Sequence, residues 1–168
     1  VFATLKTFGV VLVMAIVMHW IWLCVLFVGT GLAQGRSPVM LIKNMLPAYF
    51  TALGTMSSAA TIPVALQASK NNGVSDGIAN FTVPLCATIH LCGSTITLVT
   101  CATAVMFLSE HLAIPGYGTM LPFIMMLGVI MIAAPGAPGG GVMSALGLLT
   151  SMLGFGEASI ALMIALYL

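Results

Sequence analysis

The sequence predicts an all-α membrane protein with two opposed re-entrant helical hairpins and an interrupted transmembrane helix. Of its 168 residues, 61% are hydrophobic and only 4% are charged, whereas a soluble domain carries about 25% charged residues. Apolar stretches fill nearly the whole length, so a single secretory signal peptide does not account for them. The four Lys and Arg residues form no basic stripe that could neutralise phosphates, which argues against nucleic acid as a partner.

Residues 7–33 are expected to form a transmembrane helix. About 27 residues run without a formal charge, more than the roughly 20 that cross a hydrocarbon core, so we expect the helix to tilt. The polar stretch 34–38 closes it. His19, Trp20 and Trp22 lie near its middle rather than at its ends. We interpret them as helix-packing residues and not as an interfacial belt; for His19, a role as a proton carrier is the less favoured alternative.

Residues 44–69 predict a first re-entrant hairpin. Three basic residues bracket this segment, namely Arg36, Lys43 and Lys70. By the positive-inside tendency, they put both of its ends on the cytoplasmic side. Each arm, split at Ser57 and Ser58, has about 12 or 13 residues and reaches some 20 Å, short of a full crossing. Pro47 and Pro63 are expected to shorten the regular helix further.

The tip of this hairpin, residues 55–61, consists of small and hydroxylated residues. Such a tip leaves N–H groups and side-chain oxygens available to a polar ligand. The alternative is that the small residues mediate tight packing between helices. The short arms favour the ligand-binding interpretation.

Residues 77–109 form a second candidate span, with the sequence Thr-Ile-His-Leu-Cys-Gly-Ser at positions 88–94 in its centre. Non-helical backbone at membrane depth is tolerated only inside protein or beside a water-filled cavity. The glycine lowers the cost of leaving the helix. We therefore expect an interrupted transmembrane helix whose break forms part of a binding site.

Residues 112–156 carry no charge and predict a second hairpin. The glycine- and proline-rich run 135–141 divides the segment unequally and leaves an arm, 142–155, of about 14 residues, too short to cross the core. The run lacks the polar residues of a cytoplasmic turn, so this hairpin is expected to enter from the opposite face. Its glycines allow close approach to a ligand and suit a gate.

Residues 157–168 predict the start of a further transmembrane helix. Val1 is not an initiator Met, and Leu168 lies inside an apolar run. From these two features we expect the chain to be a fragment of a longer membrane protein.

The cysteines do not predict a metal centre. The four cysteines are Cys24, Cys86, Cys92 and Cys101. They fall within apolar segments and have no C-x-x-C spacing. A protein metal site requires clustered His or Cys ligands. We interpret Cys24, Cys86 and Cys101 as small buried hydrophobic residues, and we expect no cofactor and no bound metal beyond sodium.

Three motifs carry a family resemblance. Residues 57–64, SSAATIPV, are similar to a serine-rich hairpin tip followed by T-L/I-P-V. Residues 81–85 with 87–89 are similar to F-T/V-x-P-L-G-A-T-I, and residues 135–137 to the P-G-A of a second tip. In this order and spacing, over nearly the whole chain, they resemble the glutamate transporter family, also called dicarboxylate/amino acid:cation symporters.

The resemblance implies secondary active symport of a small dicarboxylate or amino acid, anionic or zwitterionic, driven by sodium ions and/or protons. It implies that the chain is a partial transport domain moving past a fixed scaffold in a homotrimer, in the bacterial inner (plasma) membrane. The protein would not be an enzyme. The resemblance also implies a set of substrate-binding residues: Ser57, Ser58, Ser94, Ala134, Pro135, Gly136, Ala137 and Pro138.

The cation sites depart from the family. The carbonyl of Thr88 would belong to a sodium site, but where the family reads N-M-D-G-T this chain has His90, Leu91, Cys92, Gly93 and Ser94. A thiol does not replace the hard carboxylate that suits sodium. Because histidine titrates near neutral pH, we hypothesise that His90 carries a coupling proton; alternatively, it is a neutral core histidine satisfied by a hydrogen bond.

Two other functions are weighed against transport. An ion channel can also use re-entrant hairpins and a broken helix, but neither tip has a carbonyl-filter sequence or a charged ring. An intramembrane enzyme would need a serine–histidine pair or an acid pair at depth. Ser57 or Ser58 with His90 is conceivable, yet there is no G-x-S-x-G motif. The residues that read the substrate side chain in the family lie beyond Leu168, so the substrate is not predicted.

Overall fold

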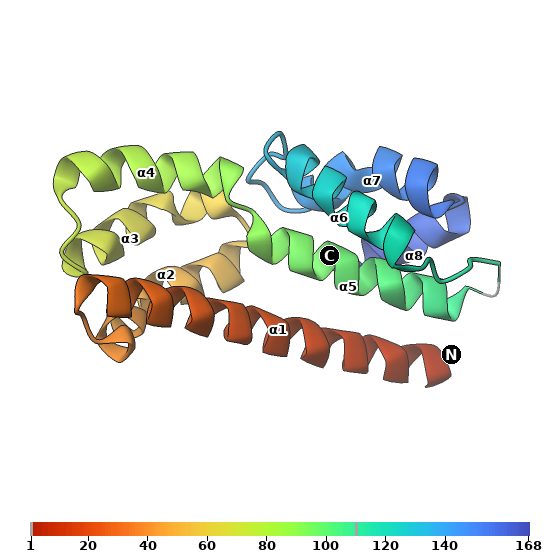
Figure 1. Ribbon diagram of the computed structural model, residues 1–168, viewed down its shortest axis with the longest axis horizontal. Coiled ribbons are helices and arrows are strands. Elements are labelled where there is room, and N and C mark those ends of the chain that lie inside the picture. The colour runs from red at the N-terminus through yellow and green to blue at the C-terminus, as the bar shows by residue number, and fades with distance from the viewer. Residues whose placement is uncertain (1, 110) are drawn as a thin grey trace. The chain divides into compact units, whose positions relative to one another are not determined.

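A computed structural model of the protein describes residues 2–109 and 111–168 (Figure 1). The described residues form eight α-helices and no strand, which confirms the all-α prediction. Re-entry of the hairpins into a membrane stays a prediction. The helices are α1 (Phe2–Gln34), α2 (Pro38–Thr55), α3 (Ser58–Asn71), α4 (Asp76–Ile89), α5 (Cys92–Leu108), α6 (Tyr117–Met131), α7 (Gly140–Leu153) and α8 (Glu157–Tyr167).

Two stretches of the described chain are long and apolar enough to cross a membrane. They are Phe8–Gln34 in α1 and Asp76–Leu108, which joins α4 and α5. Helix α1 ends in a glycine turn, because Gly35 takes a positive φ of 62° and the Arg36 N–H bonds back to the Gly31 carbonyl at 2.9 Å.

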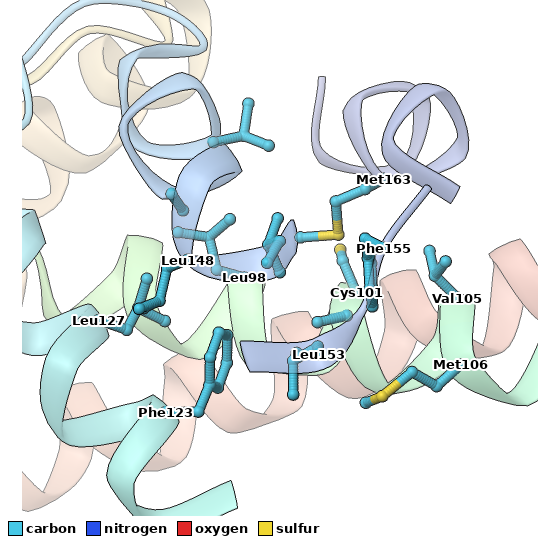
Figure 2. Close-up of a cluster of buried hydrophobic side chains, with 14 of the residues drawn as sticks. Leu98, Cys101, Val105, Met106, Phe123, Leu127, Leu148, Leu153, Phe155 and Met163 are labelled. Atoms are coloured by element: carbon cyan, nitrogen blue, oxygen red, sulfur yellow. The ribbon is translucent and has the colours of Figure 1, made fainter. Parts of the chain in front are cut away.

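The chain divides into two compact units, and the first contains residues 1–19, 91–135 and 139–168. Its core consists mainly of side chains from α5, α6, α7 and α8, together with Phe155 from the loop before α8 (Figure 2). Val11 of α1 also belongs to it. Phe123, Leu98 and Met163 are fully buried there, from α6, α5 and α8. This apolar core fixes the start of α5 and the start of α7, which carry site residues.

The second unit contains residues 20–90 and 136–138, with α2 packed on α3 and α3 on α4. Polar contacts gather where α2 begins and α3 ends. Asn44 Nδ2 donates to Asn72 Oδ1 at 2.8 Å, Asn72 Nδ2 donates to the Leu41 carbonyl at 3.1 Å, and Arg36 donates to the Asn72 carbonyl. The two ends of the 44–69 segment therefore lie together, as a hairpin requires.

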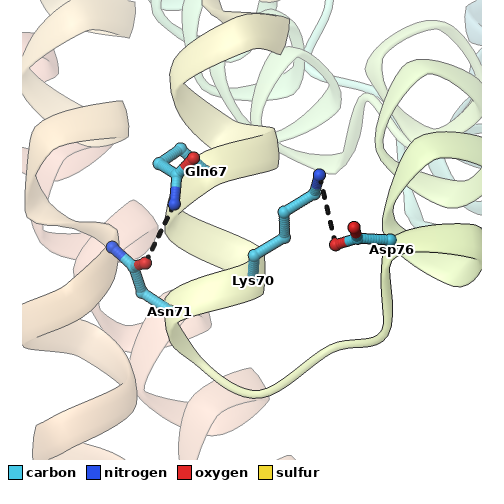
Figure 3. Close-up of polar contacts among 4 residues, drawn as sticks. All are labelled: Gln67, Lys70, Asn71 and Asp76. Atoms are coloured by element: carbon cyan, nitrogen blue, oxygen red, sulfur yellow. Dashed lines mark hydrogen bonds and ion pairs between the residues drawn. The ribbon is translucent and has the colours of Figure 1, made fainter.

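Ionic and amide contacts continue this polar end at the turn between α3 and α4 (Figure 3). Lys70 Nζ lies 3.2 Å from Asp76 Oδ1, and Gln67 Nε2 donates to Asn71 Oδ1 at 3.1 Å. Such groups are costly to place in hydrocarbon. They lie at one end of the α2–α3 pair, and we expect that end to meet water.

Two expectations about local structure are wrong. Helices α2 and α3 run through Pro47 and Pro63 instead of stopping, because packing between the helices offsets the hydrogen bond that each proline removes. Helix α2 consequently has 18 residues, about 27 Å, so the short-arm argument holds for α3 with its 14 residues. Cys24 is exposed on α1 and Cys86 is half-buried on α4 rather than buried, whereas Cys101 is buried in the first unit.

Candidate functional site

The turn between α2 and α3, residues 55–58, is the first element of the site, and we call it the first tip. Met56 is left-handed with φ 50°, and Ser57 is the N-cap of α3. The Ser57 hydroxyl accepts from the Ala60 N–H at 3.2 Å, while the Thr61 hydroxyl donates to the Ser57 carbonyl at 2.8 Å. The serine-rich sequence thus makes a side-chain-capped helix start.

The run 135–139, which we call the second tip, supplies a carbonyl to the first tip. The Ser57 hydroxyl donates to the Gly136 carbonyl at 2.8 Å, and the Ala59 N–H donates to the same oxygen at 3.2 Å. A Cβ added at Gly136 would stand 3.3 Å from the Ala87 carbonyl oxygen and 3.6 Å from Ser58 Cβ. A glycine therefore lets this backbone lie close to both the first tip and the end of α4.

The structure thus brings together three of the predicted site residues, Ser57, Ser58 and Gly136, beside the last turn of α4. Ala137 and Pro138 follow in the second tip and are exposed. The donors at the start of α3 point at a carbonyl oxygen. A helix N-terminus with free donors and a positive dipole end also suits the carboxylate of a ligand.

The break in the long apolar segment is observed at His90 and Leu91, between α4 and α5. The His90 N–H closes the end of α4 by donating to the Cys86 carbonyl at 3.0 Å, and Cys92 is the first residue of α5. Thr88 and His90 are exposed, and the Thr88 hydroxyl donates to the Leu85 carbonyl at 2.9 Å. The break therefore has a helix C-terminus, which favours cations, followed by a helix N-terminus, which favours anions.

His19, which the sequence favours as a packing residue with a proton carrier as the alternative, contacts the start of α5. Its Nε2 lies 2.9 Å from the Gly93 carbonyl oxygen at the start of α5, and its Nδ1 lies 2.6 Å from the Ala15 carbonyl oxygen. The Thr97 hydroxyl also donates to the Gly93 carbonyl, at 3.2 Å. A histidine in mid-helix among apolar residues needs such a polar partner, which is the signal the sequence offered.

Ser94 and Ala134 belong to the first unit. Ser94 is half-buried in the first turn of α5, and Ala134 is buried at 3% exposure. Beside Ser94 stand Gly141 in α7 and the hydroxyl of Tyr167, the last residue of α8. The sequence places Gly141 in the glycine- and proline-rich run 135–141 but indicates no partner for it, and Tyr167 was missed because it belongs to no motif.

Acidic and soft metal ligands do not cluster. Within residues 2–109 and 111–168, no group of three or more His, Cys, Asp or Glu side chains is arranged to hold a metal ion. The oxygens at the two tips come from backbone carbonyls and hydroxyls.

Sequence comparison identifies the family. The profile of the sodium:dicarboxylate symporter family matches residues 1–168. The chain belongs to this family. Symporters are transport proteins of membranes and not enzymes, and the resemblance seen in the three motifs is confirmed.

The chain is similar in sequence to amino acid transporters from animals. The chain is 32% identical over 136 residues to excitatory amino acid transporter 1 of Rattus norvegicus, covering 80% of this chain and 24% of that protein. It is 28% identical over 110 residues to neutral amino acid transporter A of Homo sapiens, covering 65% of this chain and 20% of that protein. The chain therefore spans between a fifth and a quarter of the length of these relatives.

Proposed function

We propose that this chain is part of the transport domain of a symporter that moves a small amino acid or dicarboxylate with a cation. The single observation that carries the proposal is the Gly136 carbonyl, which accepts from both the Ser57 hydroxyl and the Ala59 N–H. The second tip thereby occupies the donors at the start of α3. A substrate carboxylate is an acceptor for the same donors, with a full negative charge in place of a carbonyl dipole.

The substrate carboxylate would replace the Gly136 carbonyl as the acceptor, and the second tip would thereby act as a gate. When residues 135–138 move away, the Ser57 hydroxyl and the Ala59 N–H become available to a carboxylate. Charge-assisted hydrogen bonds are roughly twice as strong as neutral ones, so the anion competes well with Gly136. We propose that Ser57, Ser58 and the backbone of residues 134–138 contact the substrate, with Ser94 as a further contact supported by the resemblance.

The break supplies the proposed coupling-ion residues. The Thr88 carbonyl lies in the last turn of α4, where carbonyls lack helical partners, and half-helix C-termini coordinate sodium in transporters. Cys92 offers a thiol rather than a carboxylate. We propose that sodium binds at the Thr88 carbonyl and that His90 carries a proton in place of a second sodium ion.

Elevator-type movement and a homotrimer of the full-length protein are further parts of this proposal, supported by the resemblance. The animal relatives do not bear on the expected bacterial inner membrane, which stays a prediction. An ion channel and an intramembrane enzyme are the alternatives. The Ser57 hydroxyl bonds to two backbone groups, the Gly136 carbonyl and the Ala60 N–H, which favours a cap over a catalytic nucleophile.

Uptake by the full-length protein in proteoliposomes tests the proposal. Labelled L-aspartate, L-serine and succinate would be offered under an inward sodium gradient and, separately, under an inward proton gradient. We expect saturable uptake of at least one probe under at least one gradient. Uptake that persists without any cation gradient contradicts symport, and His90→Gln with an unchanged pH dependence contradicts the proton role of His90.

A further inference from the structure

We propose that Tyr167 is a positioning residue for the substrate site, whose hydroxyl holds the side chain of Ser94 and makes glycine obligatory at position 141. This inference rests on the proposed function, because it takes Ser94 as a substrate contact. The three residues come from three elements of the first unit: Ser94 from α5, Gly141 from α7 and Tyr167 from α8.

The geometry is a close contact at a missing side chain. A Cβ added at Gly141 would stand 2.6 Å from the Tyr167 hydroxyl oxygen, 3.4 Å from Tyr167 Cζ and 3.5 Å from Ser94 Cβ. A Cβ contact below 3.0 Å is not tolerated without movement. The phenol oxygen therefore occupies the space that any side chain at position 141 would need.

The ring of Tyr167 is held from behind. It is half-buried and packs against the apolar core of the first unit, so it cannot swing away cheaply. Its polar tip needs a partner when the ring is buried, and the Ser94 side chain is the polar group that stands beside it. The apolar core thus fixes the hydroxyl, and the hydroxyl restricts the rotation of Ser94.

The neighbouring Gly140 is required for a different contact, so the contact at position 141 can be tested separately. A Cβ at Gly140 would stand 2.4 Å from the carbonyl oxygen of Pro135, so Gly140 lets the second tip fold back on the start of α7. Gly147, further along α7, has nothing within 4 Å of an added Cβ. Three glycines of one helix therefore differ in what an added methyl group would meet.

Removal of the Tyr167 hydroxyl alone tests the positioning role. Tyr167→Phe keeps the ring in the core and should raise KM about two- to tenfold, the effect of one net hydrogen bond, with kcat unchanged. Ser94→Ala should raise KM as well, and the double variant should be no worse than Ser94→Ala alone, because both changes remove the same interaction. The readout is uptake by the full-length protein of whichever of L-aspartate, L-serine and succinate shows the largest saturable transport.

A suppressor pair tests the contact independently of transport. Gly141→Ala should lower the melting temperature of the purified full-length protein and its uptake, because the new Cβ meets the hydroxyl oxygen. Tyr167→Phe in the same protein removes that oxygen and leaves Cζ at an ordinary contact distance, so it should restore both. Gly147→Ala is the matched control: it gains the same helix propensity without a close contact, so it should lower neither.

The outcomes separate the two levels of the proposal. A Ser94→Ala variant with unchanged KM overturns the substrate role of Ser94 in the proposed function. A Ser94→Ala variant with raised KM beside an unaffected Tyr167→Phe overturns the positioning role of Tyr167. A Gly141→Ala variant with an unchanged melting temperature, or one that Tyr167→Phe does not restore, overturns the contact itself.

Discussion

The two tips are built by opposite means. The first tip has a serine N-cap, and its hydroxyls bond within the tip and the first turn of α3, in addition to the bond from Ser57 to the Gly136 carbonyl. The second tip leads into α7 through Gly139, whose φ is 74° and which provides no side-chain cap. In the second tip, the Gly136 carbonyl accepts from the Ser57 hydroxyl and the Ala59 N–H, so these bonds run to the first tip and the start of α3.

This difference assigns stability to one tip and movement to the other. A side-chain N-cap contributes about 1 kcal/mol to its helix, whereas glycine loses more backbone entropy on ordering than any other residue. The first tip is therefore a fixed platform of donors. The second tip is held in place by the contacts it makes, so exchange of those contacts for a ligand releases it at little cost.

The largest effect is expected from crowding the contact between the tips. Gly136→Val adds a branched side chain whose Cβ alone would stand 3.3 Å from the Ala87 carbonyl oxygen and 3.4 Å from the Ala59 nitrogen. The Gly136 carbonyl could then no longer return to its donors, so the gate would not close on the first tip. Uptake by the full-length protein should fall more than about tenfold, which corresponds to a rise of more than about 1.4 kcal/mol in the apparent activation free energy.

Gly128→Val in α6 controls for the substitution itself. An added Cβ at that glycine meets nothing within 4 Å, so both variants lose glycine for the same β-branched residue. Equal uptake in the two variants would contradict the importance of the contact between the tips.

The next effect concerns the cap of the first tip. Ser57→Ala removes the acceptor for the Ala60 N–H and the donor to the Gly136 carbonyl, at a cost of about 0.5–2 kcal/mol. Hydrogen exchange of the Ala60 amide, followed by mass spectrometry on the full-length protein, should accelerate about two- to thirtyfold. Ser57→Thr keeps the hydroxyl and should restore protection; unchanged exchange in Ser57→Ala would mean that the first tip does not depend on its cap.

The start of α5 is also held by a side chain, and this extends the comparison to the break. His19→Phe keeps an aromatic ring but removes the contact with the Gly93 carbonyl. Since the Thr97 hydroxyl still donates to that carbonyl, we expect a loss near the lower end of one hydrogen bond, about 0.5 kcal/mol. Exchange of the Thr97 amide should accelerate about twofold, with the Thr103 amide in the same helix as the internal reference; no change would show that His19 does not fix the break.

Local features of the site were predictable from sequence, and its pairings were not. Ser57 follows the composition of an N-cap, and the break at His90 and Leu91 follows from polar residues and a glycine in an apolar run. The partner of Ser57 is 79 residues away, and that of His19 is 74 residues away. Nothing local to either residue specifies a partner at that separation, since a carbonyl group is present at every position.

The wrong expectations have the same origin. Pro47 was expected to shorten its helix because of a rule about one residue, but packing of α2 on α3 decides the outcome. Tyr167 was missed because the space it fills is defined by Gly141 and Ser94, which lie on two other helices. A property that depends on three elements has no signature in any one of them.

The smallest effect is expected at the charged turn of the second unit. Lys70 Nζ lies 3.2 Å from Asp76 Oδ1, but the two side chains are 31% and 78% exposed. Water screens such a pair, so its contribution is at most about 0.5 kcal/mol. Lys70→Met, measured by thermal melting of the full-length protein at low and high salt, should change the melting temperature little and equally at both. A decrease that appears only at low salt would show that this ion pair fixes the α3–α4 turn, and the stable platform would then extend from the capped tip to the opposite end of α3.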